Sequence, residues 1–135
     1  MITREVDYAI RAMLCLALHK GKVISTTAMA EEMAIPYRFL RRILLRLTAA
    51  GLVVSTRGKQ GGVSLTRPAA ACSLLEVVQA LDPETITLNA CLQSSNACDR
   101  SLTCAVHTEW ARLQSLLEEQ LACITLDTLI ESEHR

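Results

Sequence analysis

The stretch from Ile35 to Gly51 has a helical repeat with one apolar side and one basic side. At about 100° per residue, the large apolar side chains gather on one face. These are Phe39, Leu40, Ile43, Leu44 and Leu47. The opposite face carries Tyr37, Arg38, Arg41, Arg42 and Thr48. Such a helix packs through one face and presents cations through the other. Pro36 fits its first turn and Gly51 its end.

Two further helical patterns precede this one. Residues 5–19 are apolar at helical spacing almost all round, which predicts a largely buried helix that Gly21 ends. Residues 26–34 predict a short second helix, for which Ser25, Thr26 and Thr27 are candidate N-caps. A short helix joined by a tight turn to a helix with a basic outer face is typical of the helix-turn-helix motif.

A β-hairpin is expected directly after the basic helix. Residues 52–55 and 63–66 have strand character, and the segment between them, 57–62, contains three glycines. Its Arg57 and Lys59 can reach phosphates or a groove. A glycine-rich loop can also cradle a nucleotide phosphate, but this loop opens no helix and lacks the Walker spacing. The expected fold class is therefore mainly α with a small β-hairpin wing.

The charges are distributed unevenly along the chain. Residues 1–67 carry eleven Lys/Arg and four Asp/Glu, whereas residues 68–135 carry three and ten. A basic half predicts a polyanionic partner, most simply double-stranded DNA, although solvated surface charge is the alternative. Only 3% of residues are aromatic, so base stacking on single strands is disfavoured and no RNA partner is expected.

The second half predicts a helix over 74–81 and a long helix that begins at Leu102. An apolar stripe follows the long helix: Leu102, Val106, Trp110, Leu113, Leu117 and Leu121. A symmetric helix–helix homodimer is the simplest partner for this stripe, and packing within one chain is the alternative. The tail over 124–130 could fold back on the long helix. We expect a DNA-binding domain over 1–70 and a ligand-loop and dimerisation region over 71–135.

Four soft donors lie close together before the long helix: Cys91, Cys98, Cys104 and His107. The segment between them is polar and lacks an apolar period, so it is expected to be a loop. Such donors indicate a metal or iron–sulfur site. A zinc site, a thiol/disulfide sensor and a vestigial site are the alternatives.

No binding or catalytic role is predicted for the remaining cysteines and histidines. Cys15 lies within the apolar surface of the first helix and is interpreted as core. Cys72 and Cys123 are isolated and interpreted as structural. No role is assigned to His19 or His134.

Several classes of protein are disfavoured. The apolar run in the first helix is far shorter than the roughly 20 residues that span a bilayer. No signal peptide is visible, so a cytoplasmic protein without a membrane partner is expected. No paired carboxylates, Ser/His/Asp pattern or nucleotide fingerprint are present, and we expect no enzyme.

Three segments resemble the Rrf2 family of bacterial winged helix-turn-helix regulators. They are 3–12 (TREVDYAIRA), 35–40 (IPYRFL) and above all 51–65 (GLVVSTRGKQGGVSL). The likeness extends over the whole chain, and the cysteine segment with Ile124-Thr125-Leu126 resembles the iron–sulfur-binding branch. The resemblance implies a homodimer held by the long C-terminal helices. It also implies a third helix in the major groove and a wing at the minor groove.

By position, the resemblance places Pro36, Arg38 and Arg41 toward the major groove and Arg57 in the minor groove. Together with the basic face and the wing, the predicted DNA-binding set is Thr26, Thr27, Pro36, Tyr37, Arg38, Arg41, Arg42, Arg57, Lys59 and Gln60.

The resemblance also implies that Cys91, Cys98 and Cys104 bind a [2Fe-2S] or [4Fe-4S] cluster. The fourth ligand varies in the family. Here it is His107 or, alternatively, Asp7 of the partner subunit. The expected function is a regulator whose operator binding is controlled by the cluster, in response to iron–sulfur status, redox state or nitric oxide. A cluster-free repressor that responds to a small molecule, a partner protein or thiol oxidation is the alternative.

Overall fold

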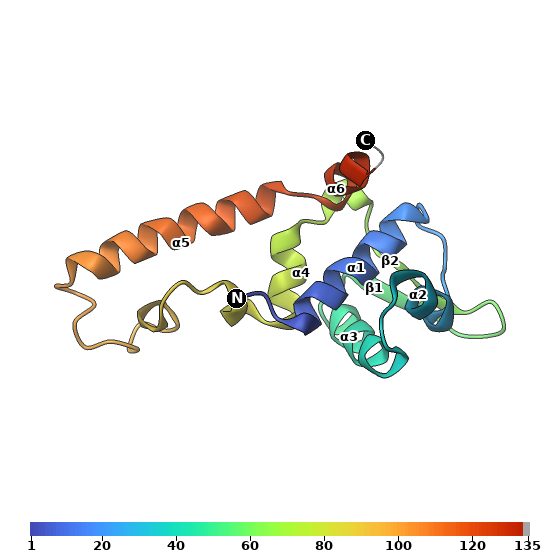
Figure 1. The fold of residues 1–135 in the computed structure, drawn as a ribbon, viewed down its shortest axis with the longest axis horizontal. Helices are drawn as coiled ribbons and strands as arrows, with labels where there is room; N and C mark the ends of the chain where they lie inside the picture. Colours follow the sequence, from blue (N-terminus) through green and yellow to red (C-terminus); the bar gives the residue numbers. More distant parts are fainter. Residues whose placement is uncertain (134–135) are drawn as a thin grey trace.

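The computed structural model describes residues 1–133, which form six α-helices and one two-stranded antiparallel sheet. His134, to which no role is assigned, and Arg135 lie outside the described residues. Most of the chain forms a head with a narrower arm projecting from one side (Figure 1). We call residues 87–116 the arm. The head is built from α1 (Arg4–Leu18), α2 (Thr26–Met33), α3 (Tyr37–Ala49), β1 (Val53–Thr56), β2 (Gly62–Leu65), α4 (Leu74–Leu81) and α6 (Leu126–Glu133).

Helix α1 is the centre of the head, as its nearly all-round apolar pattern predicts. Thr3 caps its start by accepting a hydrogen bond from the Val6 amide. Helices α2, α3, α4 and α6 all pack against it. The helix ends at Leu18, and Lys20 and Gly21 then take left-handed backbone conformations, with φ of 52° and 79°. The prediction of a buried first helix is confirmed.

Helices α2 and α3 form the predicted helix-turn-helix. Ser25 caps α2 by accepting a hydrogen bond from the Ala28 amide, and Ala34 turns the chain in a left-handed conformation with φ of 54°. The sequence analysis placed Pro36 in the first turn of α3, but Pro36 is the N-cap of this helix. Its carbonyl accepts the first helical hydrogen bond, from Leu40.

The packed face of α3 is narrower than the sequence predicts. Four of the five expected residues are buried, but Phe39 is 40% exposed. The Phe39 ring lies 6.3 Å from the Tyr8 ring, and the Arg42 guanidinium lies 5.3 Å from its centroid. These contacts hold Phe39 at the edge of the α1–α3 interface, so its prediction as a core residue is wrong. The four buried residues are Leu40, Ile43, Leu44 and Leu47.

The wing follows α3 directly, and its strands lie within one residue of their predicted positions. Val53 pairs with Leu65 and Thr56 with Gly62, in antiparallel register. Gly62 passes so close to Ile24 that a Cβ placed on it would lie 2.1 Å from the Ile24 carbonyl oxygen. This approach lets Ile24 and Val63 form a bridge that ties the segment before α2 to the wing.

The tail does not fold back on the long helix. Helix α6 packs on α1 and on the short 3₁₀ helix η1 (Ala69–Ala71), and Leu126 is fully buried in the head. The Leu126 amide donates to the Cys72 carbonyl at 3.0 Å, and the Leu74 amide donates to the Ile124 carbonyl at 2.9 Å. The expected contact with the long helix is therefore replaced by one with the head core.

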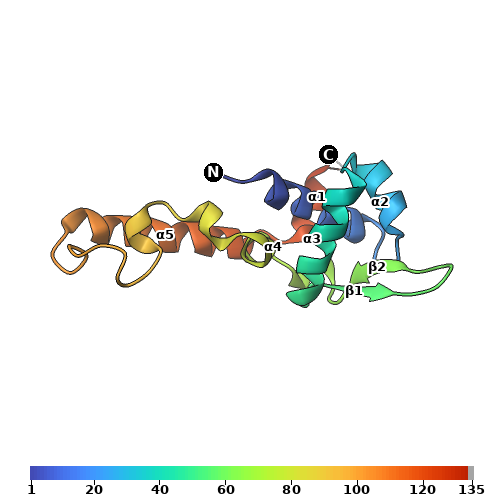
Figure 2. The ribbon, with the colours of Figure 1, turned by 90° about the horizontal axis from the view of Figure 1, so that it is seen from below.

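The long helix α5 (Ala105–Cys123) begins later than expected. Cys104 is its N-cap, so Leu102 lies in the turn before it and is 97% exposed. Only the second half of α5 reaches the head, where Leu117 and Leu121 pack against the core and α5 contacts α4. The first half extends away beside the segment that carries the cysteines (Figures 1 and 2). Two 3₁₀ helices, η2 (Pro83–Ile86) and η3 (Ala90–Leu92), mark the path of that segment.

The buried core includes residues from both sides of the expected domain boundary, such as Leu16 and Val77, so the division into 1–70 and 71–135 stays a prediction. None of the described helices is both long enough and apolar enough to cross a membrane.

Candidate DNA interface and cysteine-rich segment

The outer face of α3 is exposed along its length. Tyr37 is 49% exposed, and Arg38 and Arg41 are also exposed. Leu45, which the sequence analysis did not single out, is 71% exposed and lies on the same face, one turn after Arg41. A leucine exposed between arginines is a candidate to contact thymine methyl groups. The signal in the sequence was that Leu45 is a large apolar residue that lies outside the packed stripe of this helix.

The three predicted arginines of α3 have different surroundings. The Arg42 guanidinium lies 3.4 Å from a Glu5 carboxylate oxygen, and Arg46 also pairs with Glu5, at 3.2 Å. Within residues 1–133, Arg38 and Arg41 have no acidic partner. Arg38 and Arg41 are therefore the α3 cations that are available to a polyanion, whereas Arg42 is already partly neutralised.

A shallow hollow connects α3 to the start of α2 and to the wing. Thr26 contributes from α2, Arg41 and Leu45 from α3, and Ser55 from β1. Thr27 lies beside Thr26 and is exposed at the same helix N-terminus, where unpaired amides favour a phosphate. The fold thus brings three predicted DNA-binding segments to one side of the head.

The tip of the wing projects from the head (Figure 2). Arg57, Lys59 and Gln60 are all exposed there. Gly58 has φ of 113°, and a Cβ at Gly61 would lie 2.3 Å from the Thr56 carbonyl oxygen, so both positions require glycine. The tight turn thus holds Arg57 and Lys59 at the end of the two-stranded hairpin.

The cysteine-rich segment lies along the outer half of α5. Cys91 lies in η3, Cys98 in the following loop and Cys104 at the N-cap of α5, and all three are free and half-buried. No three of these donors, with His107 included, have ligand atoms within 4.8 Å of one another among residues 1–133. An iron–sulfur cluster distributes its thiolates over several irons, so its ligands lie further apart than those of a single ion.

His107 lies in the first turn of α5, three residues after Cys104. Its Nδ1 is the only side-chain nitrogen or oxygen within residues 1–133 that is buried without a hydrogen-bond partner. A buried polar atom without a partner is costly, and a metal bond would satisfy it. Cys104 makes no side-chain capping bond, so its sulfur is also available. These donors therefore fit an iron–sulfur cluster.

Asp7, the alternative fourth ligand, lies in the first half of α1. Its carboxylate is 2.8 Å from the Arg11 guanidinium, and both side chains are about half exposed. The Arg11 guanidinium also lies 5.4 Å from the centroid of the Tyr8 ring. In the single chain, Asp7 is thus an ion-paired residue whose side chain is half exposed.

The structure also brings together three donors that the sequence analysis did not connect. Cys15 is buried in α1, as predicted, but its sulfur lies within 4.8 Å of ligand atoms of His19 and Glu32. Burial and the nearby Glu32 carboxylate raise the pKa of the Cys15 thiol to about 12. The spacing of four residues between Cys15 and His19 was the signal available in the sequence.

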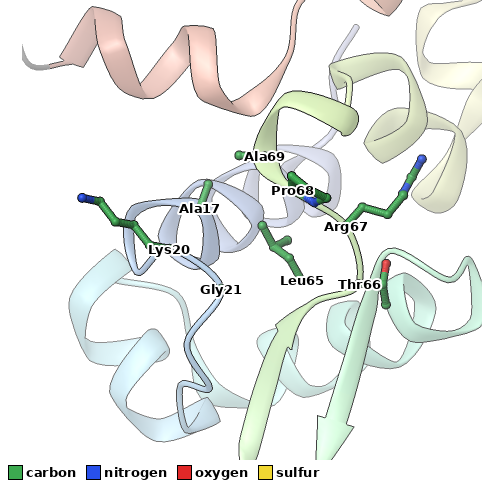
Figure 3. A pocket seen from close by; sticks show the side chains of 8 residues that line it. All are labelled: Ala17, Lys20, Gly21, Leu65, Thr66, Arg67, Pro68 and Ala69. Carbon is green, nitrogen blue, oxygen red and sulfur yellow. The ribbon is translucent and has the colours of Figure 1, made fainter.

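A further hollow of about 510 Å³ lies between the end of α1 and the chain after β2. Leu65 and Pro68 lie in the middle of its lining, and the Lys20 and Arg67 side chains lie on opposite sides with their charged ends pointing outward (Figure 3). Arg67 is held by Glu76 at 2.8 Å, so Lys20 is the cation at this hollow that has no acidic partner within residues 1–133.

Comparison with known proteins gives consistent results. A family model described as "Rrf2: Iron-dependent Transcriptional regulator" matches residues 2–132. IscR of Vibrio vulnificus is 34% identical over 130 residues, which cover 96% of this chain and 76% of that protein. A putative HTH-type regulator of Azotobacter vinelandii is 32% identical, with coverage of 96% and 78%.

Two solved structures share the fold equally well. IscR of T. potens has a TM-score of 0.77 at 26% identity and is matched over 98% of this chain and 88% of its own. CymR, the global cysteine regulator of B. subtilis, has a TM-score of 0.77 at 25% identity, with coverage of 98% and 97%. The match over 2–132, which includes the wing, the helix-turn-helix and α5, shows that this chain belongs to the Rrf2 family of transcriptional regulators, which is not an enzyme class.

Proposed function

We propose that this protein is a dimeric regulator that acts in the cytoplasm and places α3 of each head in a major groove of double-stranded DNA. The observation that carries the proposal is the pair Arg38 and Arg41, which are exposed on α3 and have no acidic partner within residues 1–133. Arginine donates in bidentate fashion to guanine, and the wing cations Arg57 and Lys59 are positioned to meet phosphates or the adjacent minor groove.

The DNA interface is tested with an operator selected from a random duplex library. Arg41→Ala should weaken binding by about 5- to 150-fold and relax base preference at one position per half-site, because a bidentate contact contributes about 1–3 kcal/mol. Lys59→Ala should weaken binding to all sequences and reduce its salt dependence.

Arg112→Ala is the matched control, since Arg112 is an exposed arginine of α5 that is paired with Glu109. If Arg41→Ala binds the selected operator as tightly as Arg112→Ala does, α3 is not the reading helix.

The dimer is proposed to form through the exposed first half of α5. Val106, Trp110 and Leu113 line an apolar patch there, and Val106 is 56% exposed. A second copy of the same helix can cover this patch, because a symmetric interface presents the same surface twice. Leu117 and Leu121, which belong to the same predicted stripe, already pack against the head.

We infer that the cysteine-rich segment holds an iron–sulfur cluster through Cys91, Cys98 and Cys104, with His107 as the fourth ligand. Three half-buried thiols, and one imidazole nitrogen that lacks a hydrogen-bond partner in the described part of the chain, support this donor set. When bound, such a cluster supplies one-electron and nitric-oxide-sensitive chemistry, and a histidine ligand raises its potential. Asp7 of the partner subunit is the rival fourth ligand.

The arm offers a route from these donors to the DNA-binding heads. Gln114 of α5 accepts a hydrogen bond from the Leu88 amide at 2.9 Å and donates one to the Ile86 carbonyl at 3.1 Å. The start of the cysteine-rich segment is therefore tied to the proposed dimer helix. A change in how Cys91 and Cys104 are held would shift α5, and with it the spacing of the two heads on DNA.

The cluster is tested by anaerobic purification with absorbance spectra and native mass spectrometry. Cys98→Ala should lose the visible absorbance and the bound iron and sulfide, while the protein stays dimeric. The matched control is Cys123→Ala, which removes an exposed cysteine outside the segment. If Cys98→Ala keeps full iron and sulfide, the ligand assignment is wrong.

The fourth ligand is tested in the same way. His107→Ala should shift the spectrum and destabilise the cluster if His107 is a ligand, whereas Asp7→Ala should do so if the partner's Asp7 is the ligand. The mass of the cluster distinguishes [2Fe-2S] from [4Fe-4S].

A second candidate is a cluster-free regulator that responds to a small molecule, a partner protein or thiol oxidation. CymR, a global cysteine regulator, matches this fold as well as IscR does, and the hollow between α1 and the chain after β2 is a place for a small molecule. A colourless protein after anaerobic purification that takes up no iron on reconstitution would support this candidate over the first.

A further inference from the structure

The end of α1 and the last turn of α2 bring a thiol, an imidazole and a carboxylate to one point. Cys15 lies in the last turn of α1, His19 follows four residues later as its C-cap, and Glu32 reaches them from α2. Their ligand atoms all lie within 4.8 Å of one another, and no other three such donors within residues 1–133 do so. This group lies in the head and shares no residue with the cysteine-rich segment.

The contacts within the group centre on Glu32. The His19 Nε2 lies 2.9 Å from one carboxylate oxygen of Glu32 and 3.1 Å from the other. The Cys15 sulfur lies within 4.8 Å of a Glu32 carboxylate oxygen. A cation between the three side chains could therefore take the place of the contact between His19 and Glu32.

The group is closed on the core side and open to solvent on the other. Cys15 is fully buried, whereas the side chains of His19 and Glu32 are 39% and 42% exposed. An ion can reach the three donors from solvent and keep a water molecule as a fourth ligand. A site with three protein ligands and one open position is a common zinc arrangement.

The chemistry of the donors selects the type of ion. Zinc accepts thiolate, imidazole and carboxylate, and in a tetrahedron with bonds of about 2.0–2.3 Å its ligand atoms lie roughly 3.5 Å apart. Moving from 2.9 Å to that separation needs only small side-chain rotations at His19 and Glu32. Magnesium and calcium prefer oxygen ligands, so a sulfur and a nitrogen among three donors disfavour them.

We propose that Cys15, His19 and Glu32 form a site for a divalent transition-metal ion of the zinc type, which joins α1 to α2. On binding, the ion replaces the thiol proton of Cys15, which passes to solvent, and the imidazole binds in its neutral form. Helix α2 packs on α3, so the bound ion also restrains the helix-turn-helix.

The test uses the full chain with Cys91, Cys98 and Cys104 replaced by serine, so that the cysteine-rich segment cannot contribute thiolates. Titration with Co²⁺ should give one thiolate-to-cobalt absorbance band per protomer, and Zn²⁺ should displace it. The unfolding temperature should rise with Zn²⁺ concentration, because the ion binds the folded state. Failure of the iron–sulfur proposal would leave this result unchanged.

The ligands are identified by conservative variants in that background. His19→Gln and Glu32→Gln should each weaken Zn²⁺ binding by at least about tenfold and remove the stabilisation. Glu31→Gln is the matched control, since Glu31 is the adjacent exposed carboxylate of α2, and it should bind as the parent does. Cys15→Ser should lose the thiolate band, whereas Cys123→Ser should keep it.

Three outcomes would overturn the proposal. They are a folded parent without a thiolate–cobalt band, a band that survives in both His19→Gln and Glu32→Gln, and a band that disappears with Cys123→Ser. Because His19 and Glu32 are half-exposed, their variants are expected to fold even if Cys15→Ser does not. Circular dichroism of each variant checks this.

Discussion

The head and the arm differ in what holds them in place. The head buries a continuous core that runs from Val6 to Ile86 and includes Leu126, whereas no residue of the arm, 87–116, is buried. The head is therefore stabilised by its own hydrophobic core. The arm has no such core, and its position depends on the continuous helix α5 and on a few hydrogen bonds. Cys91, Cys98, Cys104 and His107 and the exposed apolar patch all lie in the arm. The region with the least packing of its own is therefore the one to which the proposed cluster and the proposed dimer contact are assigned.

The strongest expected contrast is between core and arm leucines. Leu47→Ala removes a fully buried side chain of α3 and should lower the free energy of unfolding by about 2–5 kcal/mol. Leu116→Ala, at a residue that is 44% exposed, should lower it by less than about 1 kcal/mol. Urea denaturation of both variants measures the difference. Equal losses would mean that the arm carries core packing of its own.

The next contrast concerns high pH. Burial, with the adjacent Glu76 charge, raises the pKa of the Cys72 thiol from 9.0 to about 11. Between these values the unfolded chain releases the proton and the folded chain keeps it. The free energy of unfolding should therefore fall, by at most roughly 1.4 kcal/mol per pH unit for this group, as pH rises from 9.0 to about 11.

Cys15 acts in the same direction, because its pKa is raised to about 12. Cys72→Ala should then reduce the alkaline slope by about half, as measured by urea unfolding at pH values between 9 and 11. Cys91→Ala, in the arm, is the control. An unchanged slope in Cys72→Ala would contradict the burial of the thiol in the folded state.

A third test separates the arm's proposed role in dimerisation from its contribution to stability. Leu113→Asp places a charge in the exposed apolar patch and should weaken dimerisation by more than about tenfold, because a buried charge without a partner is costly. Sedimentation equilibrium measures the effect, and far-ultraviolet circular dichroism should show a folded head. Gln120→Asp, at an exposed position further along α5, should leave the dimer intact. A Leu113→Asp dimer as tight as the parent would exclude this patch as the interface.

The smallest expected effect lies where the two regions meet. Gln114→Ala removes the side-chain bonds to Leu88 and Ile86, so the Leu88 amide should exchange about fivefold faster, as expected for a bond of about 1 kcal/mol. The free energy of global unfolding should hardly change. Hydrogen exchange followed by NMR measures the local effect, and Gln120→Ala is the control. If Leu88 exchange is unchanged, Gln114 does not tie the arm together.

The elements of the head could be predicted because their signals are local. Apolar spacing located α1, α2 and α3 within a residue or two, and the glycines between Arg57 and Gly62 marked the wing. Where a side chain lies near the boundary of an apolar stripe, the pattern alone is ambiguous. Phe39 was placed in the core on that basis, but in the fold it lies at the edge, between Tyr8 and Arg42.

Contacts between distant segments could not be predicted from the pattern. The tail has the same apolar spacing whether it packs on α5 or on α1, and the backbone bonds from Cys72 and Leu74 place it on the head. In the sequence, Arg42 belongs to the same basic face as Arg38 and Arg41. In the fold, Glu5 lies beside Arg42 and pairs with it. Pairing across α1 and α3 depends on the angle at which two helices cross, which no local pattern records.

The sequence by itself determined the family, the basic face of α3 and the soft donors of the arm, because each depends on residue types at short spacings. Only the tertiary structure decided which cations have no acidic partner within residues 1–133, that His107 Nδ1 is buried without a partner among the same residues, and that Glu32 reaches Cys15 and His19. Local periodicity fixes which way a side chain points from its own helix. Which charges and donors then meet depends on how helices pack, and that is set by burial of the whole core.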